Sequence, residues 1–499
     1  MRILYVDIDS LRPDHLGCYG YHRNTSPNID RIAEQGVRFT NCYTPDAPCL
    51  PSRTALFAGR TGFHTGVVNH GGTASQPFIE GPDRQFRDRF GLTSFIQQLK
   101  YKGLYTCTIS PFGERHSAWH WYAGFREILN PGEGGMEGAE QVSPLAVDWI
   151  ERHAQQDNWF LHMNFWDPHT PYRVPQDYGE PFANDPLPAW YTEDVRRQHW
   201  EGIGPHSARE VLGWEPAGHL RTPEKVVQTY PRQPVEIASM DDARRAFDGY
   251  DTGVRYADEH LGKVLAALEA QGVLEDTWII LSADHGENLG ELNIYGDHQT
   301  ADQITCNIPL IVKMPGVTDG QGGRVDDSLI YHFDIAATVM DLLDIQPQAH
   351  WDGQSFADNL KAGQPAELRD TVVVSQNAWS CQRGVRWDHW ILVRSYHEGY
   401  HGFPDLMLFD LANDPHEQHN LAESRPDSVN EGLRRLDAWV ADQLATATNA
   451  IDPMQTVLAE GGAFHSRGAL PNYLKRLRAT GRDAWADWLE AKHPAETKA

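Results

Sequence analysis

The chain has 499 residues and a formal net charge of −26, from 43 basic and 69 acidic side chains. So acidic a chain is a poor match for nucleic acid or an anionic membrane surface, and we expect neither as a partner. Hydrophobic residues make up 40% and charged residues 22%, which is ordinary for a globular protein that is large enough for two domains.

The six cysteines, at positions 18, 42, 49, 107, 306 and 381, are scattered, and no two have the spacing of metal ligands. The chain opens with a predicted strand, which leaves no room for a signal peptide, and no apolar run is long enough to cross a membrane. We therefore expect a cytoplasmic protein with reduced thiols.

The first predicted strand, Ile3 to Ile8, is a short apolar run of the kind found in buried parallel strands. Asp7 and Asp9 stand at its carboxyl end, where open α/β sheets bind ligands, so these carboxylates are well placed for a metal. Asp7 has two interpretations: it adds a carboxylate to this metal site, or it holds an arginine.

A helix from Pro27, ending near Gly36, and a strand over Val37 to Tyr43 come next. The strand leads into a loop that winds into a helix from Ser52. Cys49 lies at the amino-terminal end of this helix, where free N–H groups and the helix dipole favour anions. Arg53 is close enough to bind the same anion through two N–H bonds. The segment therefore combines a nucleophile position with an anion clamp.

Further strands are predicted over Tyr105 to Ile109, Trp159 to Phe165 and Trp278 to Ser282, and a long helix over Met240 to Gly272. Each of these strands ends in polar residues. The turn that contains His70 lines a pocket mouth or is a plain surface loop. The aromatic cluster Trp119, Trp121, Tyr122 and Phe125 either stacks on sugars or packs in the core.

From Thr371 on, the sequence pattern changes to short predicted strands. Short antiparallel strands are predicted over Val372 to Ser375, Gly384 to Trp387, His389 to Val393 and Met407 to Asp410, then a helix over Ser428 to Thr446 and a basic helical tail over Pro471 to Lys492. We expect two domains, residues 1–366 and 371–499. Residues 173–235 are interpreted as a long insertion that shapes the substrate site.

Residues 49–60, which read Cys-x-Pro-Ser-Arg and then Leu-x-x-Gly-Arg, resemble the signature of the type I, formylglycine-dependent sulfatases. Other motifs similar to that family follow in order at residues 166–172, 284–298 and 410–422. The resemblance implies an alkaline phosphatase-like α/β fold. Its large sheet is mixed, mostly parallel and sandwiched by helices, and a smaller C-terminal α+β domain is built on a short antiparallel sheet.

In this family a maturase oxidises the signature cysteine to formylglycine, so the resemblance implies that Cys49 carries the catalytic aldehyde. It also implies one divalent metal bound by Asp9, Asp284, His285 and position 49. Such oxygen-rich ligation favours calcium, with magnesium or manganese as alternatives. Ser10 stands where many members have a second aspartate.

The resemblance further implies that Arg53 holds the aldehyde hydrate while His116, His169 and His298 share the acid and base chemistry. Arg115 and His70 are assigned to substrate binding. Asp297 replaces a lysine of many relatives, so we expect it to meet a substrate hydroxyl, an amine or His298.

We therefore expect a sulfuric ester hydrolase that acts on a sulfated carbohydrate, either a small molecule or an oligosaccharide. The alternative is a formylglycine-dependent phosphonate monoester or phosphodiester hydrolase, which Ser10 and the missing lysine keep open. A third interpretation is a non-catalytic, sugar-binding relative on the same fold.

Overall fold

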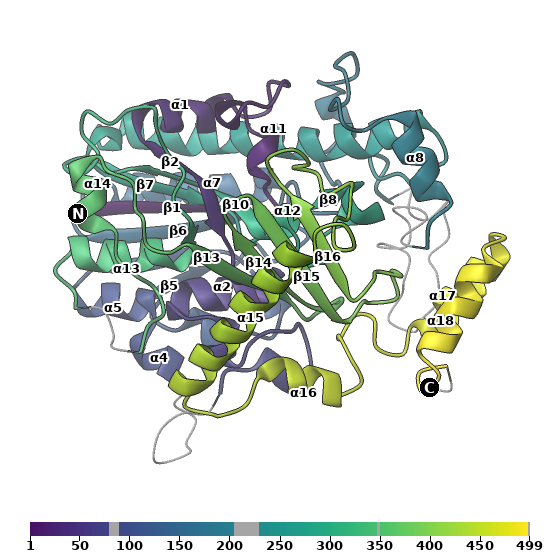
Figure 1. The fold of residues 1–499 in the computed structure, drawn as a ribbon. Coiled ribbons are helices and arrows are strands. Elements are labelled where there is room, and N and C mark those ends of the chain that lie inside the picture. Colours follow the sequence, from purple (N-terminus) through teal and green to yellow (C-terminus); the bar gives the residue numbers. More distant parts are fainter. Residues whose placement is uncertain (79–88, 204–228, 347–349, 498–499) are drawn as a thin grey trace.

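The structure, a computed structural model, describes residues 1–78, 89–203, 229–346 and 350–497, and Figure 1 shows a large and a smaller β-sheet with helices packed around them. Over these residues the expected fold class is confirmed. The larger sheet is mixed and mostly parallel, and the smaller one is mostly antiparallel.

The large sheet has the strand order β11-β2-β10-β7-β1-β6-β4-β5, and β12 also pairs with β2. The central strand β1 is parallel to both of its neighbours, β6 and β7, whereas β10 is antiparallel to both of its own. The strands are β1 (Arg2–Ile8), β2 (Val37–Tyr43), β4 (Tyr105–Ile109), β5 (Glu127–Leu129), β6 (Trp159–Phe165), β7 (Thr277–Ser282), β10 (Asn307–Lys313), β11 (Arg324–Asp326) and β12 (Ile330–Tyr331).

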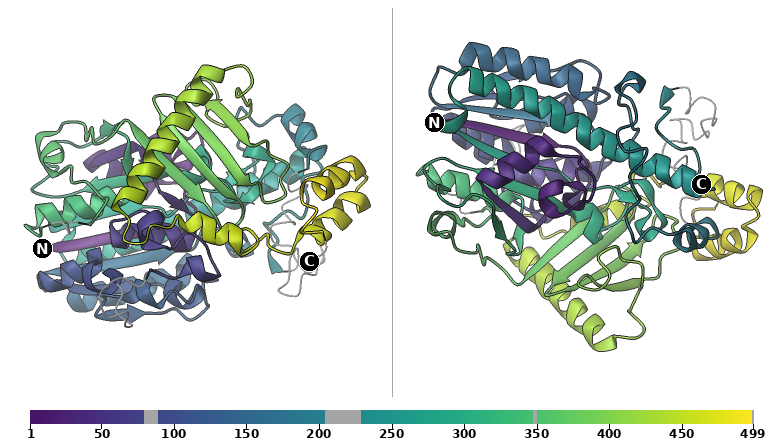
Figure 2. Two further views of the ribbon diagram at one scale, coloured as in Figure 1. Left: turned by 60° about the horizontal axis from the view of Figure 1, so that its bottom comes forward. Right: turned by 90° about the horizontal axis from the view of Figure 1, so that it is seen from above.

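Helices cover both faces of this sheet, as Figures 1 and 2 show. One face carries α1 (Pro27–Gln35), α7 (Ala139–His153) and α11 (Met240–Ala270), and the other carries α2 (Cys49–Ala58), α5 (Phe95–Tyr101) and α13 (Phe333–Leu342). Every residue of β6 is buried, as are all residues of β1 after Arg2. This explains why these strands are continuous apolar runs rather than alternating ones.

The small sheet has the order β16-β15-β14-β13-β3. Four of its strands follow residue 370, as expected: β13 (Thr371–Gln376), β14 (Cys381–Trp387), β15 (Trp390–His397) and β16 (Leu406–Asp410). The fifth, β3 (Asp46–Ala47), comes from the loop before α2 and pairs parallel with β13. Helix α15 (Pro426–Thr446) packs across this sheet (Figure 2). The division into residues 1–366 and 371–499 stays a prediction.

Shorter elements connect these layers. They are α3 (Gly62–Thr65), α4 (Arg89–Thr93), α6 (Phe112–Arg115), α8 (Glu193–Trp200), α12 (Gln303–Cys306), α14 (Ala357–Ala362), α16 (Pro453–Ala459), β8 (Asn288–Leu289) and β9 (Tyr295–Asp297). Single 3-10 turns span Pro13–His15, Gly17–Tyr19, Thr73–Ser75, Trp119–Tyr122, Gln176–Tyr178, Leu274–Asp276 and Glu291–Asn293.

Local signals set two helix boundaries. Helix α5 starts at Phe95 because the Ser94 hydroxyl accepts a hydrogen bond from the Gln97 N–H and caps the helix there. The predicted tail helix is two helices, α17 (Leu470–Ala479) and α18 (Asp483–Lys492). The break between them contains Gly481 at φ +74°, a left-handed conformation that glycine adopts without strain.

The aromatic cluster belongs largely to the core. The Trp121 side chain is fully buried, with its ring centroid 5.1 Å from that of Phe57, while Trp119 is 64% exposed. Part of the predicted substrate-shaping insertion, residues 204–228, lies outside the described residues. All six cysteines are described and are unpaired. Among the described helices, none is both long and apolar enough to cross a membrane.

Candidate active site

The predicted site residues converge at one edge of the large sheet. Asp7 and Asp9 come from the end of β1, His169 follows β6, and Asp284 and His285 follow β7. These three strands are adjacent and parallel, so their carboxyl ends meet at the same edge. Helix α2 begins there at Cys49, three residues before the predicted start at Ser52, so Cys49 lies in its first turn.

Four predicted metal ligands lie together. The ligand atoms of Asp9, Cys49, Asp284 and His285 are all within 4.8 Å of one another, and the four residues are buried. His285 Nδ1 lies 2.8 Å from the Gly286 carbonyl oxygen, so this nitrogen carries the proton and donates it. The lone pair of His285 Nε2 therefore faces the cluster, 3.1 Å from Cys49 Sγ. A histidine oriented in this way, beside two carboxylates, fits a divalent cation.

Ser10 joins the two carboxylates instead of adding a third. Its hydroxyl donates to Asp9 Oδ1 at 2.9 Å, and its backbone N–H donates to Asp284 Oδ1 at 3.2 Å. The departure from the family pattern at this position thus removes one negative charge and leaves the pair of carboxylates held in place.

Arg53 is buried among carboxylates. Its Nε donates to Asp7 Oδ2 at 2.6 Å, and its Nη1 donates to Asp9 Oδ2 at 2.9 Å and Asp284 Oδ2 at 2.6 Å. Asp7 therefore holds an arginine, the second of its two interpretations. We expected Arg53 to bind an anion through two N–H bonds, but the three carboxylates already occupy its Nε and Nη1. Only Nη2 is buried without a hydrogen-bond partner among the described residues.

The carboxylates outnumber the cations at this point: among the described residues, one guanidinium, that of Arg53, pairs with Asp7, Asp9 and Asp284. Burial, together with the negative charge of Asp9, raises the pKa of Asp284 to about 6 despite the attraction of Arg53. For Asp9 the positive charge of Arg53 outweighs the cost of burial and holds the pKa of this carboxyl below its ordinary value. The surplus negative charge is a second feature that fits a bound cation.

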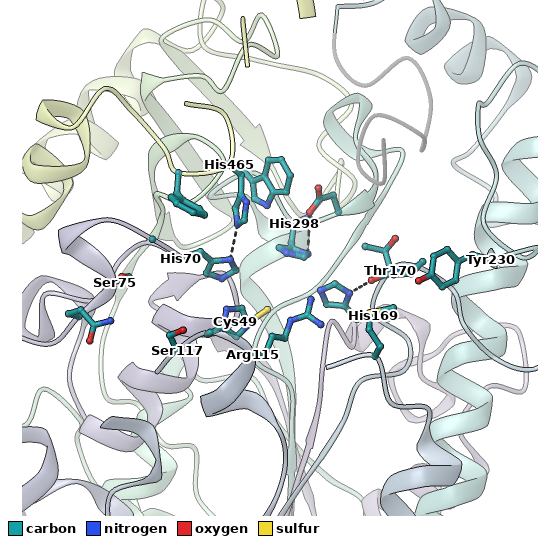
Figure 3. Close-up of a pocket in the computed structure, with 18 residues that line it drawn as sticks. Cys49, His70, Ser75, Arg115, Ser117, His169, Thr170, Tyr230, His298 and His465 are labelled. Atoms are coloured by element: carbon teal, nitrogen blue, oxygen red, sulfur yellow. Dashed lines mark hydrogen bonds and ion pairs between the residues drawn. The ribbon is translucent and has the colours of Figure 1, made fainter. Parts of the chain in front are cut away.

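A cavity of about 680 Å³ opens above Cys49. Figure 3 shows Cys49 at its floor, with imidazole rings and Arg115 around it. The predicted residues His70, Arg115, His116, His169, Asp297 and His298 all line this cavity, and so does His465, which was not predicted. Of the two interpretations of the turn at His70, the pocket mouth is therefore confirmed.

Burial keeps these imidazoles neutral. It lowers the pKa of His169 to about 3 and that of His465 to about 4, and it holds those of His70, His116 and His298 well below the ordinary value. A neutral imidazole has one donor and one acceptor nitrogen. The cavity is thus lined by groups that can each accept or pass on one proton.

The three imidazoles predicted to share proton transfer differ in their contacts. His169 Nδ1 is hydrogen-bonded to the Thr170 carbonyl oxygen, which leaves Nε2 facing Asp9 at 4.0 Å. His116 Nε2 is buried without a hydrogen-bond partner among the described residues. His298 Nδ1 lies 3.4 Å from Asp297 Oδ1.

Asp297 meets His298, one of its three expected partners. It accepts hydrogen bonds from the His298 backbone N–H at 2.8 Å and from the Gln299 side chain at 2.5 Å. Burial raises the pKa of Asp297 to about 6. The carboxylate that replaces the lysine is therefore held by its own chain while it lines the cavity.

Several lining residues escaped the sequence analysis. Among them, Trp379 lies in the loop between β13 and β14, and Phe464 and His465 lie in the segment after α16, all far along the chain from the signature. None belongs to a recognisable motif. The one local signal was the Gly461-Gly462 turn just before an exposed phenylalanine.

Comparison with known proteins agrees with this geometry. A family model described as Sulfatase matches residues 2–345. A second model, described as N-sulphoglucosamine sulphohydrolase, C-terminal, matches residues 290–438.

Relatives and solved structures span most of the chain. An uncharacterized sulfatase, YidJ, of Escherichia coli (strain K12) is 26% identical and covers 84% of this chain and 82% of its own length. The iduronate 2-sulfatase of Homo sapiens is 25% identical, and the match covers 68% of this chain and 65% of the relative.

Two solved structures share the fold. A structure in complex with its substrate D-glucosamine-2-N,6-O-disulfate has a TM-score of 0.68 at 19% identity, and the match covers 91% of this chain and 99% of that chain. The phosphonate monoester hydrolase of Agrobacterium radiobacter has a TM-score of 0.65 at 20% identity, and the match covers 89% of this chain and 96% of that chain.

Proposed function

This chain belongs to the sulfatase family, and from that premise we propose that it hydrolyses a sulfate ester of a carbohydrate in the cavity above position 49. One observation carries the proposal: a buried cysteine at a helix amino terminus lies within 4.8 Å of two carboxylates and an imidazole. The C-terminal family model and several relatives are named for sulfated sugars, which supports a carbohydrate as the substrate class.

We propose that Cys49 is converted to formylglycine by a maturase, and that Asp9, Asp284, His285 and position 49 hold one divalent cation, preferably calcium. Formylglycine supplies an aldehyde hydrate as nucleophile, and the cation neutralises charge on the sulfate oxygens. The lone pair of His285 Nε2 and the surplus negative charge of the carboxylates support a cation at this point.

The arginines serve to orient the anion. Asp7 fixes Arg53 so that Nη2 is the nitrogen left for an oxygen of the substrate or of position 49. Arg115 donates from Nη1 to the Gly135 carbonyl oxygen at 2.6 Å, and its guanidinium lies 4.6 Å from the ring centroid of Trp166. These contacts hold a permanent positive charge at the cavity wall, where it can bind sulfate.

Proton transfer falls to the neutral imidazoles. A departing alcohol needs a proton on its oxygen, and regeneration of the site needs a base. We propose that His116, His169 and His298 share these two tasks. His116 supports this assignment because its Nε2 has no hydrogen-bond partner among the described residues and is free to take or give a proton.

Mass spectrometry of the peptide that contains residue 49 tests the proposal, using protein made in a host that has the maturase. We expect a loss of about 18 Da relative to cysteine, the change from thiol to aldehyde. The Cys49→Ala variant should be folded and inactive. Cys107→Ala is the matched control, since it removes a buried thiol of β4 that does not line the cavity. Turnover by Cys49→Ala, or by protein with an unmodified thiol, would overturn the proposal.

A phosphonate monoester or phosphodiester hydrolase is the second candidate. Ser10 stands where many sulfatases have an aspartate and Asp297 where many have a lysine, and these departures from the family pattern keep the candidate open. Sulfate monoesters and phosphonate monoesters both carry one negative charge at neutral pH, so charge alone does not separate them. Measuring kcat/KM for 4-nitrophenyl sulfate and for 4-nitrophenyl phenylphosphonate on the same preparation does.

A further inference from the structure

The roof of the cavity is built by the C-terminal part of the chain. Trp379, Phe464 and His465 form it, and the Trp379 and His465 rings are stacked, with centroids 4.6 Å apart and an interplanar angle of 26°. The Phe464 ring packs against His465 at 5.2 Å and an angle of 74°. Figure 3 shows His465 on the far side of the cavity from the ribbon that carries Cys49.

Backbone and side-chain hydrogen bonds hold this roof in place. The His465 N–H donates to the Ala378 carbonyl oxygen at 2.8 Å, and the Ser466 hydroxyl donates to the Trp379 carbonyl oxygen at 2.8 Å. Glu460 accepts the Thr73 N–H at 3.0 Å. The roof is therefore built before any ligand arrives, which lowers the ordering cost of binding.

The roof also meets the floor through two histidines. His70 Nδ1 and His465 Nε2 are 2.9 Å apart, and His70 Nε2 accepts the Leu50 N–H at 3.5 Å. Because Nε2 of His70 is the acceptor, its Nδ1 carries the proton and donates it to His465. The roof is thereby linked to the residue next to the nucleophile position.

The Phe464 side chain is partly exposed at the wall of the cavity. It is 45% exposed although it lines the cavity. Its ring lies directly on the turn after His70: a Cβ atom at Gly71 would come within 2.3 Å of it. An apolar ring that is both anchored and open to a cavity is what a binding site for a partly apolar ligand needs.

Polar side chains line the cavity as well. Ser75, Gln76 and Ser117 are among its lining residues and offer hydrogen-bond donors and acceptors. A cavity with both aromatic faces and such groups matches a six-membered ring with an apolar face and a hydroxylated edge. A volume of about 680 Å³ is also within the range of roughly 300–1,000 Å³ usual for ligand pockets.

We propose that Trp379, Phe464 and His465 form the subsite for the leaving alcohol and that this subsite takes one pyranose ring, stacked on the aromatic roof. The inference rests on the proposed sulfatase reaction and adds to it the part of the substrate that is recognised. The sequence alone suggested the cluster around Trp121 as a surface on which a sugar stacks, but Trp121 is buried, whereas the three roof residues face the cavity.

The test uses two ligands that differ in the leaving group. 4-Nitrophenyl sulfate carries a ring, whereas inorganic sulfate, a product inhibitor, fills only the anion end of the site. We expect Phe464→Ala and Trp379→Ala to lower kcat/KM for 4-nitrophenyl sulfate about three- to tenfold, the range typical of aromatic contacts. The inhibition constant of inorganic sulfate should stay within about twofold of wild type, because sulfate does not reach the roof.

Trp119→Ala is the matched control, since it removes an indole that is 64% exposed and does not line the cavity. Thermal midpoints check folding, and the exposed Phe464 is the safer of the two test positions. Unchanged kcat/KM in both roof variants, or an equal weakening of inorganic sulfate, would refute the subsite while leaving the sulfatase reaction standing. A wild-type enzyme that turns over no sulfate ester would overturn the proposed function and the subsite together.

Discussion

Raising the pH should loosen helices α17 and α18 before the rest of the protein unfolds. His493, just after α18, lies between two carboxylates: its Nε2 is 2.6 Å from Glu398 Oε1 and its Nδ1 is 3.0 Å from Glu496 Oε1. Burial alone would lower the pKa of His493, but the hydrogen bonds and charges of the two glutamates outweigh it and raise this pKa to about 9. His397 and Tyr400 also contact Glu496.

The sign and size of the effect follow from linkage. A raised pKa means that the folded state holds the proton more tightly, so this stabilisation is complete below pH 6.5 and is lost as the pH rises through about 9. At about 1.36 kcal/mol per pKa unit the ceiling is roughly 3 kcal/mol. Glu496 is 27% exposed, so solvent screening leaves about 1–2 kcal/mol. Local opening should then become about 5- to 30-fold more frequent.

Hydrogen exchange of peptides from residues 470–496 measures this opening. The His493→Gln variant removes the charge, so at pH 6 it should exchange about 5- to 30-fold faster than wild type, and at pH 10 the two should agree. His389→Gln is the control, because His389 is 38% exposed on a different segment, beside Asp388. A ratio between variant and wild type that does not change with pH would refute the reasoning.

Three further predictions concern the site and the core. Asp7→Asn should lower stability by about 1–3 kcal/mol and kcat at least about tenfold, because Arg53 loses the partner of its Nε; an unchanged kcat would contradict this. Trp121→Ala should cost about 3–5 kcal/mol in urea unfolding, while Trp119→Ala stays within about 0.5 kcal/mol; equal losses would place both indoles in the core. Added calcium at about 100 times Kd should stabilise EDTA-treated protein by about 2.7 kcal/mol and restore its turnover, but should not stabilise Asp9→Asn.

The local pattern of the chain is enough to predict much of the fold. Strands such as Trp159–Phe165 are recognisable because a buried parallel strand needs an unbroken apolar run. The signature helix follows from its proline-rich beginning, although it starts at Cys49 rather than at Ser52, and from Gly59, which ends it at φ +63°. The meeting of Asp9 with Asp284 was implied by the family resemblance, and it depends on the order of the strands: β1 and β7 are adjacent and parallel, so their carboxyl ends share an edge.

Charge partners were less predictable than positions. Arg53 was expected to hold an anion, yet two of its side-chain nitrogens bind Asp7, Asp9 and Asp284. The spacing of residues in the sequence does not say which acceptors the N–H groups of the Arg53 guanidinium will bind. That division depends on how many carboxylates the neighbouring strands deliver to the same buried volume.

The strands of the large sheet, the signature helix and the polar residues at the strand ends could therefore be predicted from the sequence, because each depends on local periodicity or on a compact motif. Three-dimensional packing was needed to show that Trp121 is core while Trp379, Phe464 and His465 form the cavity roof. An aromatic or imidazole side chain has the same local signal in any loop. Whether such a side chain packs in the core or lines the cavity depends on which distant segments of the chain pack against it, and no local pattern encodes that.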